Sequence, residues 1–212
     1  MNFPGGSRIP TRIVSAMLLV FLLSPPALPA YIQELSENEV NEAYQLGQRR
    51  DQDMAKFFKE YEAVLPNALN GMHVQHLAVR TPYCAIVVRS FEAAGRYSLR
   101  QAIADAAEHA GVFQVVVWIN GYTNVSAGDI TEFKSIFWRA FAVELTQGQR
   151  IEPRKMRALP LYSEPGPAST ITGAQVYVEY EVRDIASAPA HIRVTDPDGH
   201  SVTADFDLDS LR

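Results

Sequence analysis

The stretch from Gln175 to Leu208 constrains the fold most, because its apolar residues recur at every second position. In the first run, one face holds Val176, Val178, Tyr180 and Val182. The other face holds Tyr177, Glu179, Glu181 and Arg183. A period of two is that of a β-strand with one buried face.

Two shorter runs with the same period flank a turn sequence. The runs are Ile192 to Val194 and Val202 to Leu208, and Asp196-Pro197-Asp198-Gly199 lies between them. Asp at the first position, Pro at the second and Gly at the fourth favour a type I turn that closes a hairpin. Three strands that share an apolar face need a second layer to cover them, and the rest of the chain must supply it.

Capping patterns predict helices in the first half of the chain. The predicted helices run from about Ser36 to Arg50, from Gln52 to Leu65 and from Ser98 to Ala110. Thr81-Pro82 also reads as a helix start, with Cys84 on an apolar face, but the pair Val87-Val88 also allows a strand. The sequence leaves helix and strand open for Thr81–Phe91.

Extended segments dominate the second half. Phe113–Ile119 is apolar on both faces, which is typical of a central strand. Phe137–Leu145 is spaced for a strand, and two prolines confine Ile151–Leu161 to a sheet edge. His73–Arg80 is an earlier extended segment, and Glu164–Pro167 reads as a loop within one domain.

Helices first and strands later predict an α+β fold, an antiparallel β-sandwich with a helical N-terminal layer. We expect a single domain over residues 31–212, mainly helical over 31–110 and mainly β over 111–212. The end of the chain, from Gln175 to Leu208, resembles the closing strands of immunoglobulin-like sandwiches, in which a Pro-Asp-Gly turn joins the last two strands. The paired cysteines and buried tryptophan of antibody domains are absent.

The N-terminal 30 residues have the pattern of a secretory signal peptide. Arg8 and Arg12 precede the apolar run Ile13–Leu23, and small residues lead to Ala30, the expected cleavage point. The apolar run is about half the ~20 residues needed to span a bilayer. We therefore expect an exported protein, periplasmic or extracellular, with no membrane span after signal removal.

The net charge limits the possible partners, and the cysteine content limits the possible disulfides. Loss of Arg8 and Arg12 with the signal takes the formal charge from −5 to −7. This balance argues against nucleic acid or an anionic membrane as partner. Cys84 is the only cysteine, which excludes an intrachain disulfide and, on an apolar stripe, suggests a core residue.

Two groups of residues resemble metal ligands. His73 and His76 are three residues apart, a spacing that a regular strand sends to opposite faces. Asp196, Asp198 and Asp207 stand at the first, third and twelfth positions of a possible calcium loop. That loop needs Gly at its sixth position, where Ser201 stands, and prefers Glu at its twelfth. Calcium is the only cofactor that the sequence suggests, and these three aspartates are its candidate ligands.

Other charged groups fit structural roles. Glu179 and Glu181 share a strand face, where solvation explains them better than glycosidase chemistry. Arg150, Arg154, Lys155 and Arg157 form a basic patch that suits protection of a sheet edge. The chain has no nucleophile-elbow, zinc-protease, Cys-x-x-Cys or phosphate-loop motif.

The sequence thus predicts an exported, non-catalytic binding or scaffolding module of the cell envelope, whose partner is another envelope or extracellular protein. Two alternatives stay open. One is a secreted hydrolase whose His73, His76 or His109 meets carboxylates only in the fold. The other is a calcium-stabilised extracellular module.

Overall fold

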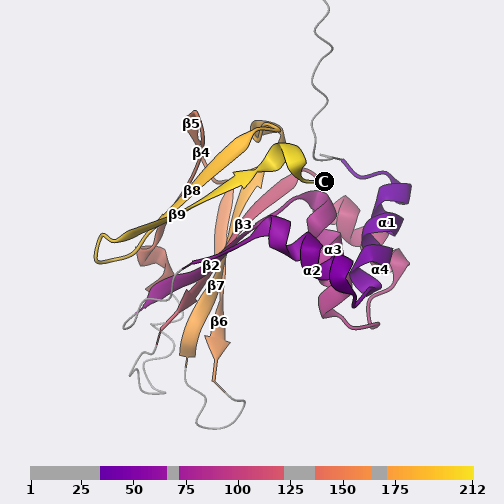
Figure 1. Ribbon diagram of the computed structural model, residues 1–212, viewed down its shortest axis with the longest axis horizontal. Helices are drawn as coiled ribbons and strands as arrows, with labels where there is room; N and C mark the ends of the chain where they lie inside the picture. The colour runs from indigo at the N-terminus through magenta and orange to yellow at the C-terminus, as the bar shows by residue number, and fades with distance from the viewer. Residues whose placement is uncertain (1–33, 66–71, 122–136, 164–170) are drawn as a thin grey trace, which may run out of the picture.

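The computed structural model describes residues 34–65, 72–121, 137–163 and 171–212 (Figure 1). The α-helices in these ranges are α1 (Glu37–Gln48), α2 (Gln52–Tyr61), α3 (Pro82–Glu92) and α4 (Leu99–Glu108). One antiparallel sheet contains, in spatial order, β1 (Glu62–Val64), β2 (His73–Arg80), β3 (Val112–Asn120), β7 (Ile171–Glu181) and β6 (Lys155–Tyr162). The other contains β5 (Gln149–Ile151), β4 (Ala142–Gln147), β8 (Pro189–Thr195) and β9 (Ser201–Asp207). Short 3₁₀ turns cover Phe137–Ala140, Val182–Asp184 and Leu208–Ser210.

This arrangement confirms the α+β class. No helix within the described ranges has both the length and the apolar character needed to cross a membrane. The expected signal peptide (1–30) and the loop Glu164–Pro167 lie outside the described residues.

The two sheets share one hydrophobic core. β3 lies at the centre of the five-stranded sheet, as its two apolar faces predicted. The core combines residues of that sheet with residues of β8 and β9, among them Val115, Val117, Val178, Ile192, Val194 and Phe206. The opposite face of the five-stranded sheet has a smaller cluster of Ala78, Val116 and Tyr177, with Trp118 packed against it.

The three C-terminal strands are divided between the two sheets. β7 pairs with β3 and β6, whereas β8 and β9 form the predicted hairpin in the second sheet. The 3₁₀ turn Val182–Asp184 and the buried Ile185 take the chain from one sheet to the other. Tyr177 is buried against Ala78 and Val116, on the face of β7 that was expected to be exposed.

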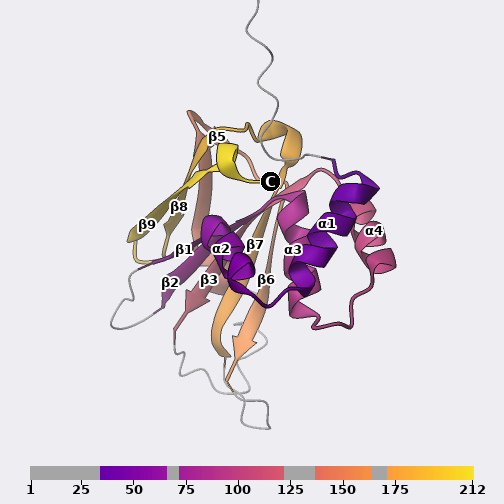
Figure 2. The ribbon, with the colours of Figure 1, turned by 45° about the vertical axis from the view of Figure 1, so that its right-hand side comes forward.

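The helices begin where the capping patterns predicted. Ser36, Thr81 and Ser98 each accept a hydrogen bond from the main chain three residues later, and Ser36 and Ser98 complete capping boxes. Thr81–Phe91 is thereby settled as helix. α1, α3 and α4 form a group beside the five-stranded sheet in both views (Figure 1, Figure 2).

Two predicted segments were wrong in part. α2 ends at Tyr61 and not at Leu65, because Glu62–Val64 pairs with β2 as strand β1. Phe137–Ala140 forms a 3₁₀ turn, and the strand starts only at Ala142. In each case tertiary pairing or packing outweighed the local apolar spacing.

Gly47 permits the close crossing of α1 and α3. A Cβ at this position would lie 2.5 Å from the Cβ of Ser90 and would also collide with the main-chain oxygen of Val87. The same crossing is joined by hydrogen bonds, because the Ser90 hydroxyl donates to Tyr44 O at 2.8 Å and accepts from Gln48 Nε2 at 2.7 Å.

We predict that Gly47→Ala lowers the free energy of unfolding by about 1–3 kcal/mol, because overpacking outweighs the gain in helix propensity. Urea denaturation would measure it. Gln45→Ala, at an exposed position of the same helix, is the control and should stay within about 0.5 kcal/mol of the wild type. A stabilised Gly47→Ala variant would contradict the packing argument.

Candidate binding site

The candidate site lies where β2 ends and α3 begins, on the face of the five-stranded sheet that holds Tyr177. Arg80 is the last residue of β2 and pairs with Gln114 of β3, while Tyr177 of β7 pairs with Arg157 of β6. Alternate residues along a strand share a face, and directly paired residues project to the same side. Arg80, Gln114, Tyr177 and Arg157 therefore lie on one face.

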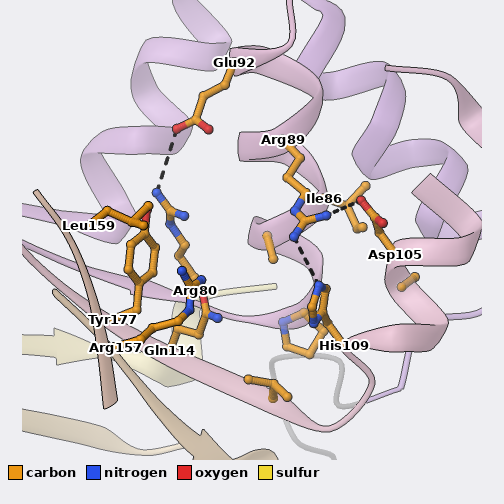
Figure 3. Close-up of a pocket in the computed structure, with 14 residues that line it drawn as sticks. Arg80, Ile86, Arg89, Glu92, Asp105, His109, Gln114, Arg157, Leu159 and Tyr177 are labelled. Atoms are coloured by element: carbon orange, nitrogen blue, oxygen red, sulfur yellow. Dashed lines mark hydrogen bonds and ion pairs between the residues drawn. The ribbon is translucent and has the colours of Figure 1, made fainter. Parts of the chain in front are cut away.

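A cavity of about 200 Å³ separates this face from α3 and α4 (Figure 3). Its polar wall includes three arginines, Arg80, Arg89 and Arg157, with Glu92, Asp105 and His109. Its apolar wall includes Ile86, Leu159 and Tyr177. A cavity that combines apolar walls with a few converging polar groups is the usual form of a small-molecule site.

Arg89 is held by partners on α4. Its guanidinium forms an ion pair with Asp105 and donates to His109 Nε2 at 3.1 Å. The Tyr97 hydroxyl also donates to Asp105, at 2.7 Å. Burial, together with this hydrogen bond to a carboxylate, raises the pKa of Tyr97. The network fixes α4 against α3 and neutralises the Arg89 charge.

Arg157 is held in a similar way on the sheet. Its Nε lies 3.5 Å from Glu179 Oε1, and its guanidinium carbon lies 4.1 Å from the centre of the Tyr177 ring. The Tyr177 hydroxyl donates to Gln175 Oε1 at 2.7 Å. The ring is thus fixed at both its edge and its face.

Arg80 differs from these two arginines. Its side chain is only 13% exposed, whereas those of Arg89 and Arg157 are 45% and 41% exposed. Its one ion-pair partner in the described part of the chain is Glu92, at 3.9 Å, and the Glu92 side chain is 64% exposed. The Arg80 guanidinium also lies 5.6 Å from the Tyr177 ring centre. The most buried of these arginines therefore has the weakest neutralisation.

Arg80 and Glu92 also line a second cavity of about 270 Å³ on the side toward α2. This cavity is lined mainly by apolar side chains, including Phe58, Phe91 and Trp118. The loose Arg80–Glu92 pair therefore borders both cavities.

Cys84 lines the second cavity and is a core residue, as predicted. It is buried, and its thiol lies 3.9 Å from Val79 O. Burial raises the pKa of Cys84 to about 12. The thiolate is the nucleophilic form, so this thiol is unsuited to nucleophilic catalysis at neutral pH.

The candidate calcium ligands are only partly brought together. Asp196 and Asp198 lie in the β8–β9 turn with His200, and a ligand atom from each lies within 4.8 Å of the others. Asp207 pairs with Pro189 at the opposite end of β9, so it does not join them. Asp196 Oδ1 already accepts from the main-chain nitrogens of Asp198 and His200, at 2.9 and 2.8 Å.

The two histidines of the other candidate metal pair lie on the same face, not on opposite faces. A β-bulge between Val74 and His76 shifts the register, so that His73 pairs with Asn120 and His76 with Trp118. The His76 ring stacks on Trp118 with centroids 4.5 Å apart. Neither histidine belongs to a group of three metal-binding side chains among the described residues.

The predicted surface charges pair with one another. Arg154 lies 3.3 Å from Glu181, and Arg150 lies 3.2 Å from Glu144. Together with Arg157–Glu179, these contacts join the basic patch to neighbouring acidic side chains. This supports a structural role for Glu179 and Glu181.

Sequence reasoning had named His109 and Arg157 for other reasons and had missed Arg80 and Arg89. The sequence did contain one signal for Arg80, since an arginine there ends an apolar strand immediately before the helix cap Thr81. The chain matches no protein-family model, and no curated protein sequence matches it.

We predict that protein stability falls as pH rises above 9, partly because of Cys84. Its folded pKa is about 12 and its ordinary value is 9.0, so only the unfolded thiol ionises between these values. The limiting slope for this group is about 1.4 kcal/mol per pH unit. Urea denaturation at several pH values would show a shallower decline for Cys84→Ala. Identical slopes for both proteins would contradict the assignment, while the tyrosines, common to both, cancel.

We predict that millimolar calcium leaves the melting temperature unchanged, because the turn's own main-chain groups occupy Asp196 Oδ1. A thermal melt in calcium and in chelator would measure this. A rise in melting temperature that Asp196→Asn abolishes would instead support the calcium-stabilised module.

Proposed function

We propose that the protein is an exported, non-catalytic binding module of the cell envelope, and that the cavity between α3, α4 and the five-stranded sheet receives its ligand. The observation that supports this most is the partly buried, weakly neutralised Arg80, whose side chain is 13% exposed, in a cavity with apolar walls. The signal-like segment supports export, and another envelope or extracellular protein is the partner that we propose.

The hydrolase alternative gains less support. His109 and Asp105 both line the cavity, but both interact with Arg89. Arg89 Nη2 contacts the ring nitrogen that would act as base. The Asp105 carboxylate bonds to Arg89 and Tyr97, while His109 meets Asp105 through main-chain atoms, its N–H donating to Asp105 O. A base–orienter pair requires the carboxylate to hold the imidazole itself.

We further infer that the two sheets form a β-sandwich with an immunoglobulin-like closing hairpin. Their shared core and the β8–β9 turn support this. Asp196 N donates to His200 O at 2.9 Å and closes the hairpin. A sandwich does not by itself determine a function, so the binding proposal rests on the cavity.

In-cell cross-linking of a C-terminally tagged chain tests the proposal, with the mature N-terminus read from the same sample. We expect a mature chain that starts near Tyr31 and a partner recovered by the wild type. Arg80→Gln should reduce that recovery about tenfold, since a hydrogen bond to a charged group is worth about 1.5–3 kcal/mol.

Arg154→Gln is the matched control, because Arg154 is exposed and pairs with Glu181 outside the cavity lining. It should retain the partner. An intact Met1 would contradict the export proposal. Equal recovery of the partner by Arg80→Gln and Arg154→Gln would contradict a role for the cavity in partner binding.

A further inference from the structure

We propose that the cavity binds a carboxylate attached to an apolar group, with Arg80 as its principal anion contact. This inference rests on the proposed function, because it names the ligand chemistry of the same site. Three observations support it: the charges around the cavity, the fixed position of Arg80, and the exposed apolar wall beside it.

The ion pairs of the arginines around the cavity favour a ligand with one negative charge. Arg89 is neutralised by Asp105, and Arg157 by Glu179. Arg80 has only the distant and exposed Glu92. A cation that is largely removed from water without a close counter-ion is destabilising, and a ligand anion would offset this cost. The balance therefore favours one negative charge over the two of a phosphate.

The position of Arg80 suits a carboxylate. Arg80 ends strand β2, and its guanidinium carbon lies 5.6 Å from the centre of the Tyr177 ring, which is itself held by Gln175 and Arg157. A planar guanidinium can donate two parallel hydrogen bonds to a carboxylate. Because the side chain is already ordered by packing, little additional freedom is lost when the ligand binds.

The walls next to Arg80 suit an apolar group. Leu159 lines the cavity with 49% of its surface exposed, and Ile86 and Tyr177 line it from α3 and the sheet. Covering Leu159 would contribute about 25 cal/mol for each Å² removed from water. A carboxylate alone would leave this surface exposed, so the ligand should combine both parts.

Such a carboxylate has two sources, a small organic acid or the C-terminus of a peptide that ends in an apolar residue. Isothermal titration with 3-phenylpropionate and with a short peptide ending in phenylalanine separates them. Tighter binding of the peptide indicates a protein C-terminus, and tighter binding of the small acid indicates a metabolite. Both results support the carboxylate assignment.

Three further probes test the two halves of the ligand. Phenylpropionamide lacks the charge, acetate lacks the apolar group, and inorganic phosphate has a larger charge. We expect each to bind at least about tenfold more weakly than 3-phenylpropionate, the equivalent of one charged hydrogen bond or one buried apolar group.

Binding to variants of the mature chain, which starts near Tyr31, tests whether the ligand occupies this cavity. Arg80→Gln should weaken binding of 3-phenylpropionate about tenfold or more. Glu92→Gln should tighten it, because it removes the carboxylate that competes for Arg80. Leu159→Asp, at a half-exposed position, should weaken it by repelling the anion. Arg154→Gln, outside the cavity lining, should not change it.

The Glu92 and Leu159 variants change exposed side chains, so they keep the test valid if Arg80→Gln fails to fold. Failure of both carboxylates to bind, or unchanged binding in the Glu92 and Leu159 variants, would overturn the inference. If the neutral amide or phosphate binds best and Arg80→Gln abolishes that binding, the inference falls but the proposed binding function stands. If the cross-linked partner is also retained by Arg80→Gln, the cavity's role in partner binding falls as well.

Discussion

The turn from β2 into α3 is the constraint on which the rest of the candidate site depends. Thr81 is fully buried there, and its hydroxyl accepts from Cys84 N at 3.1 Å while it donates to the main-chain oxygen of Arg212. Pro82 occupies the first turn of the helix, where its missing N–H is no loss. Only Thr81 separates β2 from α3, so the helix starts directly at the end of the strand. Arg80 on the strand and Arg89 on the helix consequently line one cavity.

The two faces of the five-stranded sheet have different roles, one in stability and the other in the proposed binding. One face packs with the second sheet into the main core, and its residues are aliphatic and aromatic. The other face is only partly covered by helices, and it combines Tyr177 with charged side chains (Figure 3). β3 is apolar on both faces because it serves both environments. Substitutions on the cavity face can therefore alter binding while leaving the main core intact.

The arginines illustrate how context decides the role of one residue type. Arg89 and Arg157 are half-exposed and have close carboxylate partners, so they connect elements at little cost. Arg80 is far more buried and has a long contact to an exposed glutamate. Desolvation of a charge without close pairing is unfavourable. Arg80 is therefore the arginine of this cavity that is best placed to bind an anion.

The sequence by itself determined the local features, because capping residues, turn residues and a period of two act over a few neighbouring positions. It predicted the α+β class, the Ser36 and Ser98 helix starts and the hairpin around Gly199, whose φ of 86° suits glycine. Only the tertiary structure assigned β7 to a different sheet from the hairpin, moved His73 and His76 to one face through a bulge, and brought Arg80 near Arg89. These outcomes depend on strand pairing and on side-chain burial between distant segments, and neither is encoded in the spacing of one segment alone.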